Sequence, residues 1–202
     1  TWRLVQCDVG QGDALVIKIS SSSALLFDAG PDPDLLDRCL KSIGVKHLPL
    51  IVLSHNHADH YYGVSGALRK REIGQIWSNG NISRAELSNY SVSKVGAGDI
   101  ARIDDVSLEV LWPPATSSQF SNLSGDGSQE NNRSLVILAQ VGQVKILITG
   151  DIEPGAQEEI AKRYDLSGIS ILKVPHHGSR FQSEYFLNQI SPDISLISVG
   201  ES

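Results

Sequence analysis

Short apolar runs separated by polar turns dominate the first quarter of the chain. Residues 2–8 alternate between apolar and polar positions, and a glycine-containing turn leads directly into the next run. Runs of this kind predict β-strands, here at residues 2–8, 14–19, 24–27 and 48–53. The last of these runs is wholly apolar, which is typical of a strand buried on both faces.

Apolar residues at helical spacing alternate with these strands. Leu36, Leu40 and Ile43 recur at intervals of three and four, so residues 32–42 are predicted to form a helix that Gly44 ends. Further helices are expected at about residues 63–69, 154–163 and 184–189. Strands are expected at 75–77, 106–112, 134–140, 144–148, 169–174 and 194–199, with weak strands within 78–105 and a Ser/Gly-rich loop at 113–129. This mixture predicts an α/β (α+β) layered fold.

Composition narrows the class of protein. The 202 residues are 41% apolar, enough for one large domain or two small ones. No apolar run approaches the roughly 20 residues that cross a bilayer. The chain begins with Thr1 and has no methionine, so we expect it to be a piece excised from a longer protein.

Charge and cysteine content limit the binding modes. The net charge is −6 and no stretch gathers Lys and Arg, so a polyanion would have to be held by metal ions or by other parts of the protein. Cys7 and Cys39 form neither a CxxC pair nor a zinc-finger pattern. They could form one disulfide or remain two buried thiols, and we favour thiols.

Ligand-type residues follow three apolar strands. Directly after residues 48–53, His55 and His57 could face one metal ion, and Asp59 and His60 a second. Asp151 follows another strand, where a helix N-cap is an equally good interpretation. His176 and His177 follow a third strand, where a turn packed on the sheet edge is the simpler alternative. Together these strand ends predict a metal site.

At these positions the chain resembles the metallo-β-lactamase superfamily over nearly its whole length. More narrowly, it resembles the hydrolase domain of the ComEC family of DNA-uptake (competence) proteins. The resemblance rests on Asp8-Val9-Gly10-Gln11-Gly12-Asp13, Asp28-Ala29-Gly30, Leu53-Ser54-His55-Asn56-His57-Ala58-Asp59-His60, Asn131-Asn132-Arg133-Ser134-Leu135-Val136, Thr149-Gly150-Asp151 and Pro175-His176-His177-Gly178-Ser179.

The resemblance implies a fold and a setting. The fold would be a four-layered αββα sandwich, formed by residues 1–202 as a single domain of a larger multi-pass membrane protein. An Asn-x-Tyr-Gly-His-Pro stretch, usual in the family after such a domain, is absent, so we expect a C-terminal truncation. The domain would lie on the extracytoplasmic face of the bacterial inner membrane, beside membrane-channel and OB-type domains of the same polypeptide, without touching lipid itself.

The resemblance also implies roles for individual residues. Two divalent ions, manganese or zinc, would be held by His55, His57, Asp59, His60, Asp151 and His176, with His177 as second choice. Asp59 and Asp151 would also position the attacking water. Residues assigned to support or substrate contact are Asp28, Asn131, Asn132, His177 and Ser179. Asp28 could equally cap its own turn, and Asp8 and Asp13 are expected to be structural.

The asparagine pair bears on the choice of metal. Many superfamily members carry a further histidine where this chain has Asn131 and Asn132. An amide oxygen is a weaker and harder ligand than imidazole, which makes manganese as plausible as zinc.

Three functions follow from these residues. The leading hypothesis is a nuclease (phosphodiesterase) that degrades the non-transported strand of incoming DNA, with single-stranded DNA as substrate. A hydrolase of a small ester, thioester or lactam would use the same metals. A non-catalytic, metal-stabilised accessory domain of a transport channel is the third possibility.

Overall fold

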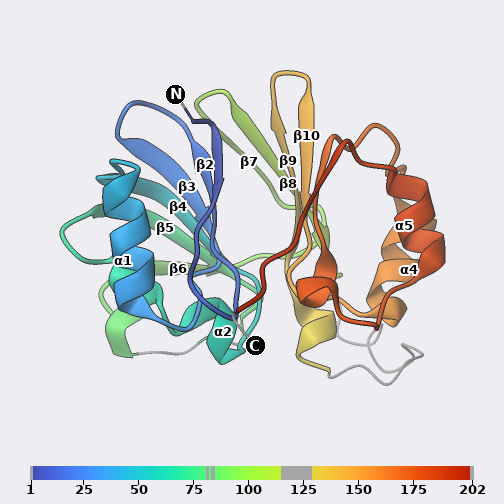
Figure 1. Cartoon of the computed structure of the whole chain (residues 1–202), viewed down its shortest axis with the longest axis horizontal. Coiled ribbons are helices and arrows are strands. Elements are labelled where there is room, and N and C mark those ends of the chain that lie inside the picture. Colours follow the sequence, from blue (N-terminus) through green and yellow to red (C-terminus); the bar gives the residue numbers. More distant parts are fainter. Residues whose placement is uncertain (1, 81, 83–84, 115–128, 201–202) are drawn as a thin grey trace. The chain divides into compact units, whose positions relative to one another are not determined.

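A computed structural model describes residues 2–80, 82, 85–114 and 129–200. The chain divides into two compact units, which we call unit 1 (Thr1–Val95 with Ser198–Ser202) and unit 2 (Gly96–Ile197). Each unit contains one mixed six-stranded sheet and its own helices (Figure 1). The predicted α/β class is therefore confirmed.

The sheet of unit 1 has the strand order β1-β2-β3-β4-β5-β6. Its first three strands are antiparallel neighbours, and β3 to β6 run parallel. The strands are β1 (Leu4–Gln6), β2 (Leu15–Lys18), β3 (Ser23–Phe27), β4 (His47–Leu53), β5 (Glu72–Ser78) and β6 (Ser91–Lys94). The helices are α1 (Pro33–Ser42), α2 (Ala58–Tyr61), α3 (Val64–Ala67) and the 3-10 helix η1 (Ala85–Leu87).

Strand register brings three connecting segments to one edge of this sheet. Leu15, at the start of β2, lies opposite Phe27, at the end of β3. Phe27 in turn lies opposite Val52, near the end of β4. The segments that enter β2 and leave β3 and β4 therefore emerge side by side, and they carry the aspartates and histidines singled out above.

Helix α1 forms where its apolar spacing predicts. The Asp32 carboxylate caps it by accepting hydrogen bonds from the backbone N–H groups of Asp34 and Leu35, and Pro33 occupies the first turn. Leu36 and Leu40 are fully buried in the core of unit 1. Figure 1 shows α1, in blue, lying along the sheet of β2 to β6.

The two cysteines form a disulfide, so the preference for free thiols was wrong. Cys7 follows β1 and Cys39 lies in α1, with their Cα atoms 5.8 Å apart. Cys39 lies on the helix face that packs against the core of unit 1, and Cys7 belongs to that core. Their spacing of 32 residues carries no sequence signature, because the pairing depends on how α1 packs on the sheet.

The sheet of unit 2 has the order β12-β11-β10-β9-β8-β7. Strands β10 to β12 are parallel, and the other neighbours are antiparallel. The strands are β7 (Ile100–Ile103), β8 (Val106–Trp112), β9 (Val136–Val141), β10 (Val144–Ile148), β11 (Ile171–Lys173) and β12 (Ile194–Leu196). The helices are α4 (Pro154–Arg163), α5 (Glu184–Ile190) and the 3-10 helices η3 (Asn131–Arg133) and η4 (Pro175–Gly178).

Most differences from the prediction concern boundaries. The helix expected at 63–69 is the shorter α3, and the HxHxDH segment before it forms a separate short helix, α2, that was not predicted. The weak strands expected within 78–105 are β6 and β7. Most of the loop predicted at 113–129 lies outside the described residues. Among the described helices, none has the length and apolar character needed to cross a membrane.

Candidate metal centre

Three imidazole rings cluster in the segment that follows β4. The ring centroid of His55 lies 4.6 Å from that of His57 and 4.2 Å from that of His60. His55 and His60 are fully buried. Asp59 Oδ2 lies 3.8 Å from His60 Nε2. Unit 1 thus brings together all four ligand-type residues that the sequence placed in this segment.

Hydrogen bonds define the protonation of two of these rings. Asp28 Oδ2 lies 2.8 Å from His60 Nδ1, and because a carboxylate only accepts, Nδ1 carries the proton. Ser54 Oγ donates its single proton to Asp28 Oδ2 at 2.8 Å and therefore accepts from His55 Nδ1 at 3.0 Å. Nε2 is consequently the unprotonated nitrogen of both neutral rings, as in histidines that bind metal through Nε2.

The buried Asp28 carboxylate holds this cluster in place. Its Oδ1 also accepts the backbone N–H of Ser54, at 2.7 Å, so one buried carboxylate holds both the first residue of the motif and the His60 ring. Its backbone lies in the left-handed region, with φ 58°. For a non-glycine residue this conformation costs of order 1–3 kcal/mol and is tolerated where the surroundings demand it.

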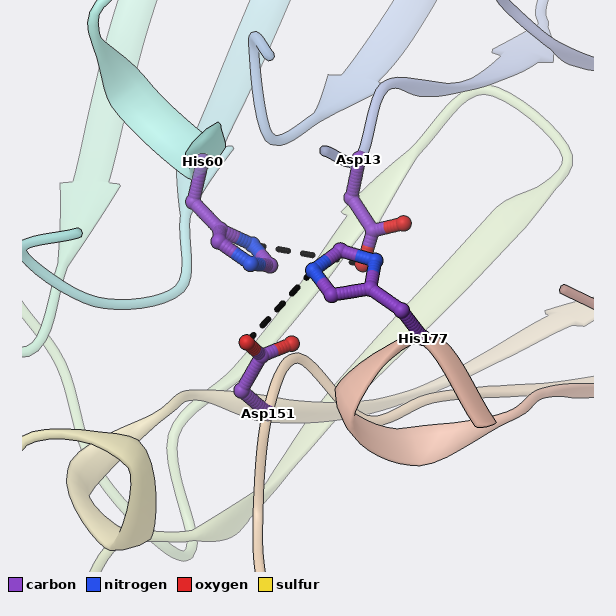
Figure 2. Close-up of side chains that lie close together, drawn as sticks. All are labelled: Asp13, His60, Asp151 and His177. Atoms are coloured by element: carbon purple, nitrogen blue, oxygen red, sulfur yellow. Dashed lines mark ion pairs between the residues drawn. The ribbon is translucent and has the colours of Figure 1, made fainter. Parts of the chain in front are cut away.

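Asp13 lies beside the same histidine, although its sequence position suggested a structural role. Its Oδ2 is 3.9 Å from His60 Nδ1, and the residue is 4% exposed (Figure 2). Sequence reasoning missed it because a Gly-x-Gly-Asp turn explains an aspartate through backbone geometry alone. The usable signal was its place two residues before β2, at the edge where Asp28 and Ser54 emerge.

Unit 2 places a second group of ligand-type residues at one edge of its own sheet. Ile148 of β10 lies opposite Lys173 of β11, so the segments after these parallel strands emerge together. His177 Nε2 lies 3.6 Å from Asp151 Oδ2 in the first of them (Figure 2). His176 Nε2 lies 3.9 Å from the same oxygen.

The two histidines differ in their surroundings. The His177 side chain is 7% exposed and faces Asp151, whereas the His176 side chain is 26% exposed and its Nδ1 lies 3.4 Å from Glu153 Oε1. The geometry therefore favours His177 as the ligand, although the sequence pattern ranked His176 first. Both residues adopt left-handed backbone conformations, with φ 47° and 52°, which sequence patterns do not reveal.

The asparagine pair organises the turn after β10. Asn131 Nδ2 donates to Glu153 Oε1 at 2.8 Å, and Asn132 Oδ1 accepts the backbone N–H of Glu153 at 3.0 Å. Ser134 Oγ accepts the N–H of Asp151 at 3.0 Å. Helix α4 takes Glu153 as its N-cap residue, so the alternative of Asp151 as the cap is wrong. Sequence reasoning missed Glu153, which reads simply as the residue before a helix.

Ser179 has a local role in the structure. Its Oγ accepts the backbone N–H of Phe181 at 3.3 Å, and its own N–H donates to the carbonyl of His176 at 2.8 Å. These bonds shape the turn that carries the two histidines.

The donors in both units suit a divalent transition metal. Unit 1 offers imidazole Nε2 atoms whose opposite nitrogens are hydrogen-bonded, together with carboxylate oxygens. Unit 2 offers Asp151 with an imidazole nitrogen beside it. Mixed imidazole and carboxylate sets of this kind bind zinc, manganese or iron. Each unit therefore carries Asp and His side chains of the kind that could hold a metal ion.

Comparison with known proteins agrees with this chemistry. The family model of the metallo-beta-lactamase superfamily matches residues 7–201. ComE operon protein 3 of Bacillus subtilis is 25% identical over 225 residues, which cover 96% of this chain and 28% of that protein. Competence protein ComA of Neisseria gonorrhoeae is 29% identical over 198 residues, covering 96% of this chain and 26% of that protein. The chain thus spans about a quarter of the length of these relatives.

A solved structure extends the likeness to the fold. The metal-dependent hydrolase Tm1679 of the beta-lactamase superfamily aligns with a TM-score of 0.57 and 13% identity, covering 98% of this chain and 96% of that one. At this identity the match shows the fold alone. The prediction of a metallo-β-lactamase-like fold is confirmed.

Proposed function

The chain belongs to the metallo-β-lactamase superfamily of metal-dependent hydrolases, and from this premise we propose that it is a nuclease domain acting on single-stranded DNA. It would degrade the strand of incoming DNA that is not transported during competence. The observation that carries the proposal is the buried His55–His60 cluster, whose rings are oriented by hydrogen bonds at Nδ1, in a chain whose relatives are competence proteins.

Donors from both units would hold two divalent ions, manganese or zinc. Unit 1 would contribute His55, His57, Asp59 and His60, and unit 2 would contribute Asp151 with His177 in place of His176. When bound, such ions supply positive charge that lowers the pKa of water and neutralises charge developing on a phosphodiester. Support for this sharing comes from the incomplete donor set of each unit and from the order of the superfamily motifs along the chain.

The protein's own residues would orient the reactants. The Asp59 side chain is 31% exposed and can meet solvent, so its carboxylate can align a water molecule by hydrogen bonding. Asp151 is almost fully buried and would do the same from unit 2. Asp28 keeps the proton on His60 Nδ1 throughout, because its carboxylate accepts from that nitrogen.

The acidic surface is consistent with a centre that grips the substrate through its ions. At a net charge of −6 the chain repels a polyanion at long range. Binding would therefore depend on divalent metal and on other domains of the polypeptide. The domain would act beside membrane-channel and OB-type domains, since the relatives are about four times as long as this chain.

The disulfide supports a location on the extracytoplasmic face of the membrane. Disulfides persist in oxidising compartments and are rare in the reducing cytosol. The Cys7–Cys39 bridge of unit 1 is thus what a domain exposed outside the inner membrane would carry.

Incubation of the protein with labelled single-stranded DNA and Mn²⁺ tests the function. Cleavage should occur, be abolished by chelation, and be lost in His57→Ala. The matched control is His47→Gln, because His47 lies at the other end of β4, where its Nδ1 pairs with Ser23 Oγ. Absence of cleavage in metal-loaded protein would contradict a nuclease and leave the accessory-domain alternative. Faster turnover of a β-lactam or thioester than of a nitrophenyl phosphodiester would point to the small-substrate alternative.

A further inference from the structure

We infer that Asp13 is a metal-binding carboxylate of this centre, a role that neither the superfamily motifs nor its place in the opening turn assigns to it. The inference rests on the proposed metal site and adds a donor to the unit 1 group. It comes from the position of the Asp13 carboxylate, which is buried beside His60 and offers an oxygen within 4.8 Å of a ring nitrogen that could bind the same ion.

The backbone around Asp13 is held by two other segments of the site. The N–H of Asp13 donates to the carbonyl of Asp59 at 3.1 Å, and its carbonyl accepts the N–H of Gly30 at 2.8 Å. Gly12 has φ 143°, and a Cβ there would collide with the carbonyl oxygen of Asp59. The loop can approach Asp59 this closely only because residue 12 is glycine. These contacts fix the backbone of Asp13 against the segments that carry Asp59 and Gly30.

Asp8 and Asp13, the two aspartates of the loop, have different roles. The exposed Asp8 uses Oδ1 to accept the N–H of Gly10 at 3.3 Å, which is the turn-stabilising role expected of an aspartate. Asp13 closes the loop through its backbone, while its side chain turns toward His60 (Figure 2). A carboxylate buried beside an imidazole is costly in a purely structural turn, but it is what a bound cation requires.

The added carboxylate has a consequence for the choice of metal. Asp28, Asp59 and Asp13 all lie within 3.9 Å of a ring nitrogen of His60. In unit 2, amides stand at Asn131 and Asn132, where many superfamily members carry a histidine. Replacing imidazole by carboxylate oxygen shifts a site toward harder ions, so Asp13 should favour Mn²⁺ over Zn²⁺.

Metal binding by Asp13→Asn tests the inference, with Asp8→Asn as the matched control from the same loop. Titration calorimetry with MnCl2 and metal analysis after dialysis would be applied to the whole chain with its disulfide intact. Asp13→Asn should lower Mn²⁺ affinity by at least about tenfold, the scale of loss seen when a group supporting a metal site is removed. Its Zn²⁺ affinity should fall less, and Asp8→Asn should match the wild type.

Each other outcome is decisive. Equal Mn²⁺ affinity in Asp13→Asn and wild type would overturn the inference while leaving the metal-dependent function intact. A wild-type protein that binds neither ion would instead remove the proposed function on which the inference depends. An Asp13→Asn protein that shows no cooperative thermal transition before metal is added would mean that the carboxylate serves the fold itself, which also overturns the inference.

Discussion

The ligand-type residues of the two units are placed by the same strand arrangement but are held by different interactions. In unit 1, the segment that enters β2 emerges beside the segments that leave β3 and β4. In unit 2, the segment that enters β9 emerges beside the segments that leave β10 and β11. Unit 1 then orders its histidines with buried charge, through Asp28 and Ser54. Unit 2 uses neutral amides and a left-handed backbone at His176 and His177.

This difference indicates which changes in conditions or sequence should disturb each group of residues. Unit 1 depends on ionised side chains and one covalent bridge, so pH, reduction and charge-neutralising substitutions should affect it most. Unit 2 shapes its turns mainly through backbone conformation and amide hydrogen bonds, and its titratable contacts are those of His176 and His177 with carboxylates. Substitutions in each unit should show which of these interactions its metal affinity and stability depend on.

The largest effect is expected from removing one ligand in each unit. His60→Ala and Asp151→Ala should each lower the rate of DNA cleavage by about a thousandfold or more, equivalent to about 4 kcal/mol in the barrier. If both units serve one centre, the double variant should be scarcely slower than either single variant, because residues acting as a unit are non-additive. Single-turnover rates measure this. Fully additive losses would mean that the two groups act independently.

Loss of the disulfide should be next in size. Replacing Cys7 and Cys39 by alanine releases a loop with a sequence separation of 32 residues. In the chain-entropy model this lowers the free energy of unfolding by about 3–4 kcal/mol. Urea denaturation of the metal-free protein measures it, and adding reductant should destabilise the wild type but leave the double variant unchanged. A wild type indifferent to reductant would show that the bridge is not formed.

Supporting carboxylates in the two units should differ in importance. Asp28→Asn removes the acceptor that keeps the proton on His60 Nδ1, and we expect metal affinity to fall by about 10–100-fold. Glu153→Gln changes a residue that contacts His176, the less favoured ligand, and should have a smaller effect. Calorimetric titration of both variants measures the contrast. A larger loss in Glu153→Gln would restore His176 as the principal ligand.

The smallest effect concerns acid stability. Burial alone would raise the pKa of Asp37, but hydrogen bonds and charge from Lys41 and Arg71 outweigh it and hold this pKa below its ordinary value. The pairing therefore stabilises the folded protein above the ordinary carboxyl pKa of about 4, and the contribution disappears as pH falls through the lowered folded value.

Asp37→Asn tests this dependence. It should reduce the loss of unfolding free energy between neutral and strongly acidic pH in the metal-free protein. Denaturation curves at several pH values for variant and wild type measure the difference. Superimposable pH profiles would show that the Asp37 ion pairs contribute nothing to stability.

Much of the fold followed from local sequence. Helix α4 and strand β10 lie at the predicted residues, and α1 lies within one residue of its prediction, because their periodicity, caps and flanking turns agree. The weak strands β6 and β7 had no sharp predicted bounds. Their burial alternates only partly, since each lies at the edge of a sheet and packs on few neighbours.

The candidate site was only partly readable from sequence. His55, His57, Asp59 and His60 are adjacent in the chain, so their grouping follows from one turn after β4. The disulfide and the approach of Asp13 to His60 depend on register and packing between distant segments, which spacing does not encode. Both His176 and His177 lie in a turn with left-handed backbone angles, which most residue types avoid and no pattern predicts, so the sequence could not show which ring faces Asp151 more closely.

The covalent link at residue 7 bears on how far the N-terminal end can open. Strand β1 is an edge strand of only three residues, and short edge strands fray readily. Fraying of β1 should stop at Cys7, because this residue is bonded to Cys39 in α1. The edge of the first sheet that carries the histidines should therefore be protected from opening of β1. Amide exchange should be fast before the bridge and slow beyond it.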